Sequence, residues 1–302
     1  MPAAMDLQEF GERWLDVSGV RTRYFDAGAG EPPVVFIHGG QMGDPSGGEN
    51  AEDWAFNFRP LSQNHRVVAI DRLGQGYTDN PKDDADCTMA GAVSHATSFL
   101  RALGAGPYNL VGHSRGGYIA GAITLANPEL VNACAIIDSA SAGPGEGRND
   151  IVFCTNPHPP GTLEASRFVY EGYSCTFDHI TSDWLAMKQK ITDLPKNREM
   201  IERMNANLLA SRFLPDFVED RDRFFERIAS DGFRRPVLLV WGYDDPTAPL
   251  QMGLDLFDAI AKNQPRTSFH VLNKAGHFSF RERPQEFNRV ISDFFTGVAQ
   301  GD

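Results

Sequence analysis

Apolar residues gather in six short runs, and each run ends at a turn rich in glycine or acidic residues. The runs are Val34–Ile37, Val67–Ile70, Tyr108–Val111, Ala133–Ile137, Pro236–Trp241 and Ser268–Leu272. Most are rich in Val, Ile and Leu, as buried parallel strands are. Most are separated by segments with helical spacing, such as Ala90–Leu103 and Gly116–Ala126, and Pro284–Phe295 predicts a C-terminal amphipathic helix. This alternation predicts an α/β fold with a mostly parallel central sheet and helices on both faces.

One segment interrupts the alternation between strands and helices. Gly143–Phe213 begins with stretches rich in Gly and Pro and continues as amphipathic sequence. Within it, Ile180–Leu194 and Asn197–Ser211 have the apolar spacing of helices. We therefore expect residues 143–213 to form a helical lid, with residues 1–142 and 214–302 forming the core.

The composition is that of an ordinary globular enzyme with an acidic surface. The chain has 302 residues, of which 41% are hydrophobic and 23% charged, so it can bury one large core. Its net charge is −12, and no Lys/Arg cluster interrupts the acidic balance. We therefore expect neither nucleic acid nor an anionic membrane as a partner. A small-molecule substrate remains the expected partner, and a homo-oligomer is left open.

Cysteine usage and the N-terminal segment restrict the class further. The four cysteines, Cys87, Cys134, Cys154 and Cys175, form no C-x-x-C pair and have no metal-ligand spacing to a histidine. We expect free thiols, no metal and no cofactor. The N-terminus lacks a basic start with an apolar run, and no stretch is long enough to span a membrane. The expected location is the cytoplasm.

The strongest chemical signal is a G-x-S-x-G motif at Gly112–Gly116, which lies between a predicted strand and a predicted helix. Its glycines permit the sharp turn that raises a serine hydroxyl above the edge of a sheet. The N-terminus of the following helix offers free N–H groups and the positive end of a dipole. The sequence therefore predicts Ser114 as a nucleophile.

A serine nucleophile needs a base, and the base needs an acid that orients it. His277 follows the last predicted strand, and Asp245 follows the strand before it. Both loops fall at the sheet edge to which Ser114 points, and the order Ser…Asp…His is the one that this fold uses. We predict a triad of Ser114, His277 and Asp245.

Other residues compete for these roles. Asp244 and Asp138 are alternatives for the acid. His113 is the spacer within the motif, with its side chain expected to point away from the hydroxyl. The remaining histidines are interpreted as surface residues or as hydrogen-bonded core residues, and we assign His38 to the support of its own loop.

An oxyanion hole needs N–H donors from a second loop. The segment His38-Gly39-Gly40 follows a strand, so its backbone can face the pocket. We predict the main-chain N–H groups of Gly40 and Arg115 as the donors. Another turn, Asp71–Thr78, contains G-x-G, but it lacks the rest of a phosphate-binding pattern and is interpreted as structural.

Several motifs across the chain form a set. They are His38-Gly39-Gly40, the D-x-x-G-x-G-x-T turn, Gly112–Gly116, Trp241–Asp245 and Gly276-His277. Together they resemble the α/β-hydrolase superfamily over nearly the whole chain.

Within that superfamily, the sequence is most similar to the meta-cleavage product hydrolases, which split C–C bonds in dienoates formed by aromatic ring opening. The resemblance rests on Gly19–Gly28, on Trp54 followed by Arg59, and on the stretch Thr176–Asp183. The family carries a lid arginine that holds the substrate carboxylate. Lys188 stands at that position here, so the resemblance implies a cation with the same charge but without the bidentate fork.

The chain departs from the family pattern near the site. His113 and Phe56 stand where the family has Asn, although Asn57 follows directly, and Phe278 replaces a Trp. The loop Gln41–Asp53 is longer and more acidic than the family's. The resemblance implies substrate contacts from Lys188, Phe278, Trp54 and Asn57.

These observations favour a serine hydrolase that cleaves a C–C bond in a ring-fission dienoate of the 2-hydroxy-6-oxo-hexa-2,4-dienoate type. A carboxylesterase or lactonase with the same triad is the alternative. A non-catalytic ligand receptor on the same fold is a third, and the intact triad argues against it.

Overall fold

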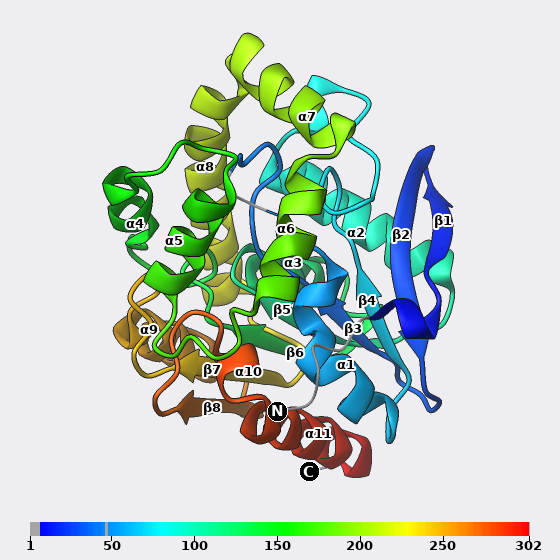
Figure 1. The fold of residues 1–302 in the computed structure, drawn as a ribbon. Helices are drawn as coiled ribbons and strands as arrows, with labels where there is room; N and C mark the ends of the chain where they lie inside the picture. The colour runs from blue at the N-terminus through cyan, green and yellow to red at the C-terminus, as the bar shows by residue number, and fades with distance from the viewer. Residues whose placement is uncertain (1–6, 46–47, 302) are drawn as a thin grey trace.

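A computed structural model describes residues 7–45 and 48–301. The central element is an eight-stranded sheet with the strand order β1-β2-β4-β3-β5-β6-β7-β8 (Figure 1). The strands are β1 Arg13–Val17, β2 Val20–Ala27, β3 Val34–Ile37, β4 Val67–Ile70, β5 Tyr108–His113, β6 Val131–Ile137, β7 Val237–Gly242 and β8 Thr267–Leu272. From β4 to β8 all neighbouring strands are parallel. The six apolar runs are therefore strands, and the predicted mostly parallel sheet is confirmed.

The antiparallel hairpin formed by β1 and β2 at one edge of the sheet was not predicted from the sequence pattern. Buried polar residues within β2, Thr22 and Arg23, obscure it. Arg23 is held by Asp71, with Nε 2.7 Å from Oδ2. Ser18 and Gly19 join the strands with positive φ angles of 54° and 83°, as tight hairpin turns require.

Helices cover both faces of the sheet. The helices outside the β6–β7 connection are α1 Ala55–Ser62, α2 Met89–Leu103, α3 Arg115–Ala126, α9 Leu250–Ala261, α10 Ser279–Glu282 and α11 Pro284–Gln300, with short 3-10 turns at Leu7–Phe10, Ala51–Trp54 and Asp84–Asp86. Successive residues of β3 face opposite layers: Val35 packs in the layer with α2, α3 and α9, and Phe36 packs in the layer with α1 and α11. The predicted C-terminal helix is present as α11.

Five helices connect β6 to β7. They are α4 Asn149–Thr155, α5 Leu163–Tyr173, α6 Ser182–Thr192, α7 Pro195–Ala206 and α8 Leu209–Ser230. Figure 1 shows α4 to α7 at the end of the molecule away from α11. The helix predicted at Ile180–Leu194 is α6. The prediction of one helix over Asn197–Ser211 is wrong in one respect. The helical conformation is interrupted at Leu208, where φ is +54°, so α7 and α8 are separate helices.

The expected end of the lid at residue 213 falls inside α8, which continues to Ser230. The far half of α8 packs into the core, where Phe224 and Ile228 are buried with residues of α2 and α3. The near half carries residues that line the cavity described below. The division into core and lid stays a prediction. The N-terminal segment 1–6 and residues 46 and 47 of the acidic loop lie outside the described residues.

Candidate active site

Ser114 lies at the turn between β5 and α3, with φ 53° and ψ −121°. Such a positive φ is uncommon for a residue other than glycine. The flanking glycines make the turn possible. A Cβ atom on Gly112 would lie 2.1 Å from the carbonyl oxygen of Gly116, and one on Gly116 would lie 2.2 Å from that of Ile37. The motif therefore holds Ser114 in a strained position at the carboxyl end of β5, as in a nucleophile elbow.

His277 and Asp245 are in direct contact. His277 Nδ1 lies 2.8 Å from Asp245 Oδ2, and both side chains are buried. The other oxygen, Asp245 Oδ1, accepts hydrogen bonds from the backbone N–H groups of Thr247 and Ala248, each at 2.8 Å. The backbone N–H of His277 donates to the carbonyl of Tyr173 at 2.8 Å. These contacts fix the orientation of the His277 imidazole ring. Asp245 engages Nδ1, so Nε2 is the ring nitrogen that is left to act as a base.

Among the described residues, neither Ser114 Oγ nor His277 Nε2 has a hydrogen-bond partner. Both residues line one cavity, together with Gly40 and Arg115. The cavity thus brings the predicted nucleophile, base and oxyanion donors together. In free enzymes the hydrogen bond between nucleophile and base is often loose and tightens only when substrate binds.

The two alternative acids face elsewhere. Asp244 Oδ2 contacts the thiol of Cys175 at 3.6 Å. Asp138 accepts hydrogen bonds from the backbone N–H of Gly242 and from both the N–H and the hydroxyl of Ser279. Burial, and then the charge of Asp245, raise the pKa of Asp138 well above its usual range. Asp138 therefore ties two loops together beneath the site, and only Asp245 among the three meets His277.

His113 supports the histidine loop. Its Nε2 lies 2.7 Å from the carbonyl oxygen of His277. Burial, followed by the nearby His277, lowers the pKa of His113 well below its usual range, so the ring is neutral. A carbonyl only accepts, and Nε2 must therefore carry the single ring proton. The His113 ring holds the His277 backbone in place.

Arg72 and His38 orient the loop that carries Gly40. Arg72 Nη1 donates to the carbonyl oxygens of His38, Gly39 and Gly40, at 3.2, 2.8 and 3.0 Å. His38 Nδ1 lies 2.8 Å from the Gly39 oxygen, and His38 Nε2 accepts from the Arg72 backbone. The carbonyl and N–H of a trans peptide point in opposite directions. The Gly40 N–H therefore points away from Arg72, and the interpretation of His38 as a loop support is confirmed.

The sequence pattern did not predict this role of Arg72, although a charged residue just past the buried run Val67–Ile70 is a signal for it. We expect Arg72→Met to lower kcat by about ten- to a hundredfold with little change in KM, because the Gly40 N–H would lose its fixed direction. Steady-state hydrolysis of a neutral nitrophenyl ester measures this. Arg59→Met, a half-exposed arginine of α1, serves as the control. An unchanged kcat in folded Arg72→Met would contradict this role.

The cavity has a volume of about 740 Å³, which is in the range of small-molecule sites. Phe278, Tyr170 and Tyr173 form an aromatic wall, with ring centroids 5.8 and 6.3 Å from Phe278 to the two tyrosines. Phe217 of α8 lines the cavity as well. The prediction that Phe278 contacts substrate fits this position.

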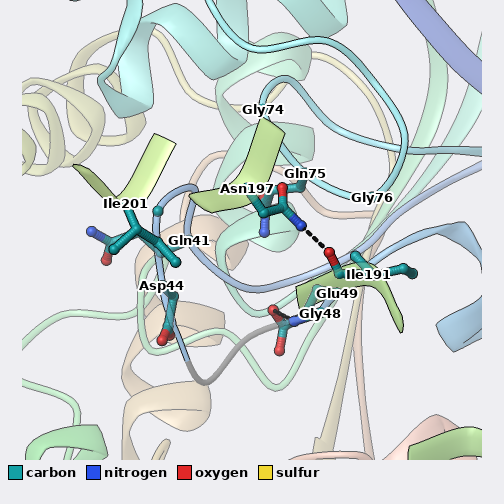
Figure 2. Close-up of a pocket in the computed structure, with 11 residues that line it drawn as sticks. Gln41, Asp44, Gly48, Glu49, Gly74, Gln75, Gly76, Ile191, Asn197 and Ile201 are labelled. Atoms are coloured by element: carbon teal, nitrogen blue, oxygen red, sulfur yellow. Dashed lines mark hydrogen bonds between the residues drawn. The ribbon is translucent and has the colours of Figure 1, made fainter. Parts of the chain in front are cut away.

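Figure 2 shows a smaller pocket between the loop carrying Gln41 and Asp44, the Gly74–Gly76 turn, and residues of α6 and α7. Its lining shares Gln41, Asp44 and Glu49 with the cavity. Its volume is about 20 Å³, enough for about one water molecule. The turn itself is closed by Asp71, whose Oδ2 accepts from the Tyr77 N–H at 2.8 Å. A carboxylate of the chain itself therefore accepts from this turn, in agreement with the structural interpretation of the turn.

Three residues predicted to contact substrate do not line the cavity. Trp54 is buried against Phe36 and Phe280, with ring centroids 4.7 and 4.2 Å away. Asn57 donates to the carbonyl of Phe280 at 2.9 Å. Both are core residues: Trp54 ends the 3-10 turn before α1, Asn57 lies in α1, and both contact Phe280 of α10. The third residue is Lys188.

Lys188 is fully buried, so it is not a surface lysine. Its ammonium forms an ion pair with Asp53 and donates to the carbonyl of Gly48 at 3.1 Å. The ring of Trp184 lies 5.0 Å from Nζ. The charge of Lys188 is already compensated, and the pair connects α6 to the loop before α1. A substrate carboxylate would have to displace Asp53 to use this cation.

We expect Lys188→Met to destabilise the protein by about 3–5 kcal/mol, because Asp53 would be left buried without its counter-charge. The double variant Lys188→Met/Asp53→Leu removes both charges and should recover most of the loss. Unfolding in urea measures both. Equal stability of wild type and the single variant would show that the pair contributes nothing.

Within residues 7–45 and 48–301, no cluster of three or more His, Cys, Asp or Glu residues could hold a metal ion. No helix in the same part of the chain is long and apolar enough to cross a membrane. All four cysteines are free.

Comparisons with known proteins place these features in context. The family model described as alpha/beta hydrolase fold matches residues 32–284. The 2-hydroxymuconate semialdehyde hydrolase of Pseudomonas sp. strain CF600 is 28% identical over 300 residues, covering 97% of this chain and 96% of that protein. A 2-hydroxy-6-oxononadienedioate/2-hydroxy-6-oxononatrienedioate hydrolase of Paraburkholderia phymatum is 26% identical, covering 91% of both chains.

Solved structures agree on the fold. The meta-cleavage product hydrolase of Pseudomonas fluorescens IP01 matches with a TM-score of 0.75 and 24% identity, covering 95% of this chain and 98% of that one. These comparisons confirm the resemblance drawn from the sequence motifs at both levels, the α/β-hydrolase superfamily and the meta-cleavage product hydrolases within it.

Proposed function

The chain belongs to the alpha/beta hydrolase fold family and is a hydrolase, and from this premise we propose that it cleaves a C–C bond in a ring-fission dienoate. The proposed catalytic residues are Ser114 as nucleophile, His277 as base and Asp245 as the acid that orients it. The proposed oxyanion donors are the backbone N–H groups of Gly40 and Arg115.

One observation carries the proposal: a serine on a strained elbow shares a cavity with a histidine that is bound to a buried aspartate. The relatives support the choice of bond, because their names give hydrolases of hydroxymuconate and oxononadienedioate compounds. The aromatic wall around Phe278 suits a flat, conjugated substrate. We also propose that α4 to α7 form the lid that excludes water from this cavity.

The chemistry would start within the substrate, where a proton moves from the 2-hydroxyl group to the carbon beside the 6-oxo group and gives a 2,6-dioxo compound. Ser114 Oγ then attacks the 6-oxo carbon and gives its proton to His277 Nε2. The negative oxygen is stabilised by the N–H groups of Gly40 and Arg115. As the C–C bond breaks, its electron pair stays on the departing carbon, which takes the proton from His277. Water activated by His277 then releases the acyl group from Ser114.

A substrate panel tests this proposal. We expect kcat/KM for a ring-fission dienoate, followed by the loss of its absorbance, to exceed that for nitrophenyl esters by at least about tenfold. Efficient ester hydrolysis with no action on the dienoate would favour the carboxylesterase or lactonase. No turnover of either class would leave a ligand receptor.

A further inference from the structure

One cation on the cavity wall, Arg115, forms no ion pair among the described residues. Arg115 directly follows Ser114 and lines the same cavity. Its Nη1 atom is buried and has no hydrogen-bond partner among the described residues. No carboxylate in that part of the chain lies within ion-pairing distance of the guanidinium. Arg115 as a whole is half-buried, but its buried Nη1 donor has lost water without gaining a partner, which is costly for a charged group.

Two rings of α8 hold this guanidinium in place. Arg115 Cζ lies 4.9 Å from the ring centroid of Phe213 and 5.9 Å from that of Phe217. Aromatic faces attract a cation and leave its N–H edge free. Asp44 and Glu49 are near enough for their charges to oppose the lowering of the Arg115 pKa by burial. The site is therefore arranged to keep a charged, planar and unoccupied donor beside the nucleophile.

Two further cations are candidates for binding an anionic ligand. Lys188 lies outside the cavity lining and is paired with Asp53. Arg221 of α8 lines the cavity, and its Nη2 donates to the carbonyl oxygens of Gly143 and Gly145, each at 2.6 Å, while its buried Nε has no partner among the described residues. Acidic side chains, including Asp44 and Asp53, contribute to the rest of the wall. An anionic ligand in this cavity would be repelled from most of the surface and attracted to Arg115.

We infer that the side chain of Arg115 binds the carboxylate of the substrate, in the role that the position of Lys188 suggested for a lid cation. This inference deepens the proposed function and rests on it for the identity of the substrate. The class of substrate is an acid whose carboxylate is separate from the carbonyl that Ser114 attacks. The guanidinium offers the bidentate geometry that a lysine lacks.

The test compares each acid with its own neutral form. The first pair is a ring-fission dienoate and its methyl ester, and the second is mono-4-nitrophenyl succinate and its methyl ester. The readout is the ratio of kcat/KM for the acidic over the neutral member, because losses common to both cancel. We expect Arg115→Met to lower this ratio by about ten- to a thousandfold and Arg115→Lys to lower it less. Arg223→Met, on an exposed arginine of α8 outside the cavity lining, is the control and should change it by less than about threefold.

The outcomes separate the two claims. If wild type leaves the dienoate intact, the proposed function fails, and the nitrophenyl pair still decides the role of Arg115. A wild type without preference for the acidic succinate, or an unchanged ratio in Arg115→Met, would overturn the inference. A selective loss in Arg221→Met instead would assign the carboxylate to that residue. Should Arg115→Met fold poorly, Arg115→Gln keeps hydrogen-bond donors without the charge and gives the same comparison.

Discussion

Replacing Ser114 with alanine is expected to lower kcat by about 10⁴- to 10⁶-fold, because the reaction would lose its nucleophile while the oxyanion donors and the binding cavity remain. Alanine is small enough to occupy the turn, whose φ of 53° is strained for any side chain. The fold should therefore survive, and substrate should still bind. Steady-state kinetics and equilibrium binding of the dienoate measure the two effects separately.

His277→Ala is the companion to this variant. Since base and nucleophile act as one unit, the loss should be about as large as in Ser114→Ala, and the double variant should lose little more. Fully additive losses would mean that the two residues act in separate steps. A Ser114→Ala enzyme with more than about a tenth of wild-type kcat would remove Ser114 from the mechanism.

The second large effect is expected from Asp245→Asn, with a loss in kcat of about 10³- to 10⁴-fold. Asparagine fits the space but can offer its amide N–H to His277 Nδ1. The ring would then carry its proton on Nε2, where it could not accept the proton of Ser114. The pH dependence of kcat reports this change of tautomer.

Two neighbouring carboxylates provide controls for Asp245. Asp244→Asn alters an exposed group that contacts Cys175, and we expect kcat to change by less than about threefold. Asp138→Asn replaces one of the two acceptor oxygens that serve the Gly242 N–H and Ser279 and should act mainly on stability. A severe loss of kcat in Asp244→Asn, with a mild one in Asp245→Asn, would reassign the acid.

The sequence predicted the fold where burial is continuous. Parallel strands such as Val67–Ile70 are covered on both faces, so they appear as plain apolar runs. The hairpin of β1 and β2 does not appear as an apolar run, because Arg23 is buried through a contact with Asp71, a residue 48 positions away. Such pairing across the chain has no periodic trace. The full length of α8 was also hidden from the sequence, because Pro215 lies inside this helix and a proline usually indicates a helix end.

The candidate site also contains residues that local motifs predict and residues whose roles depend on contacts far along the chain. Ser114, His277 and Asp245 were predicted because each lies at the end of a strand, within a motif that fixes its direction. The predicted roles of the three substrate-contact residues outside the cavity depended on a resemblance in sequence alone. Lys188 meets Asp53 across 135 residues, and no local pattern reveals that its charge is taken. Arg115 was considered only for its main chain, because its cavity-facing side chain depends on the position of α8.

The most direct test of the account is a reaction of the purified wild-type protein with a ring-fission dienoate, analysed by absorbance and by mass spectrometry of the products. We predict loss of the dienoate with formation of one carboxylic acid and one shortened hydroxydienoate in equal amounts, and no detectable reaction with Ser114→Ala. A dienoate that stays intact in the presence of an enzyme active on nitrophenyl esters would contradict the account, as would equal cleavage by the Ser114→Ala variant.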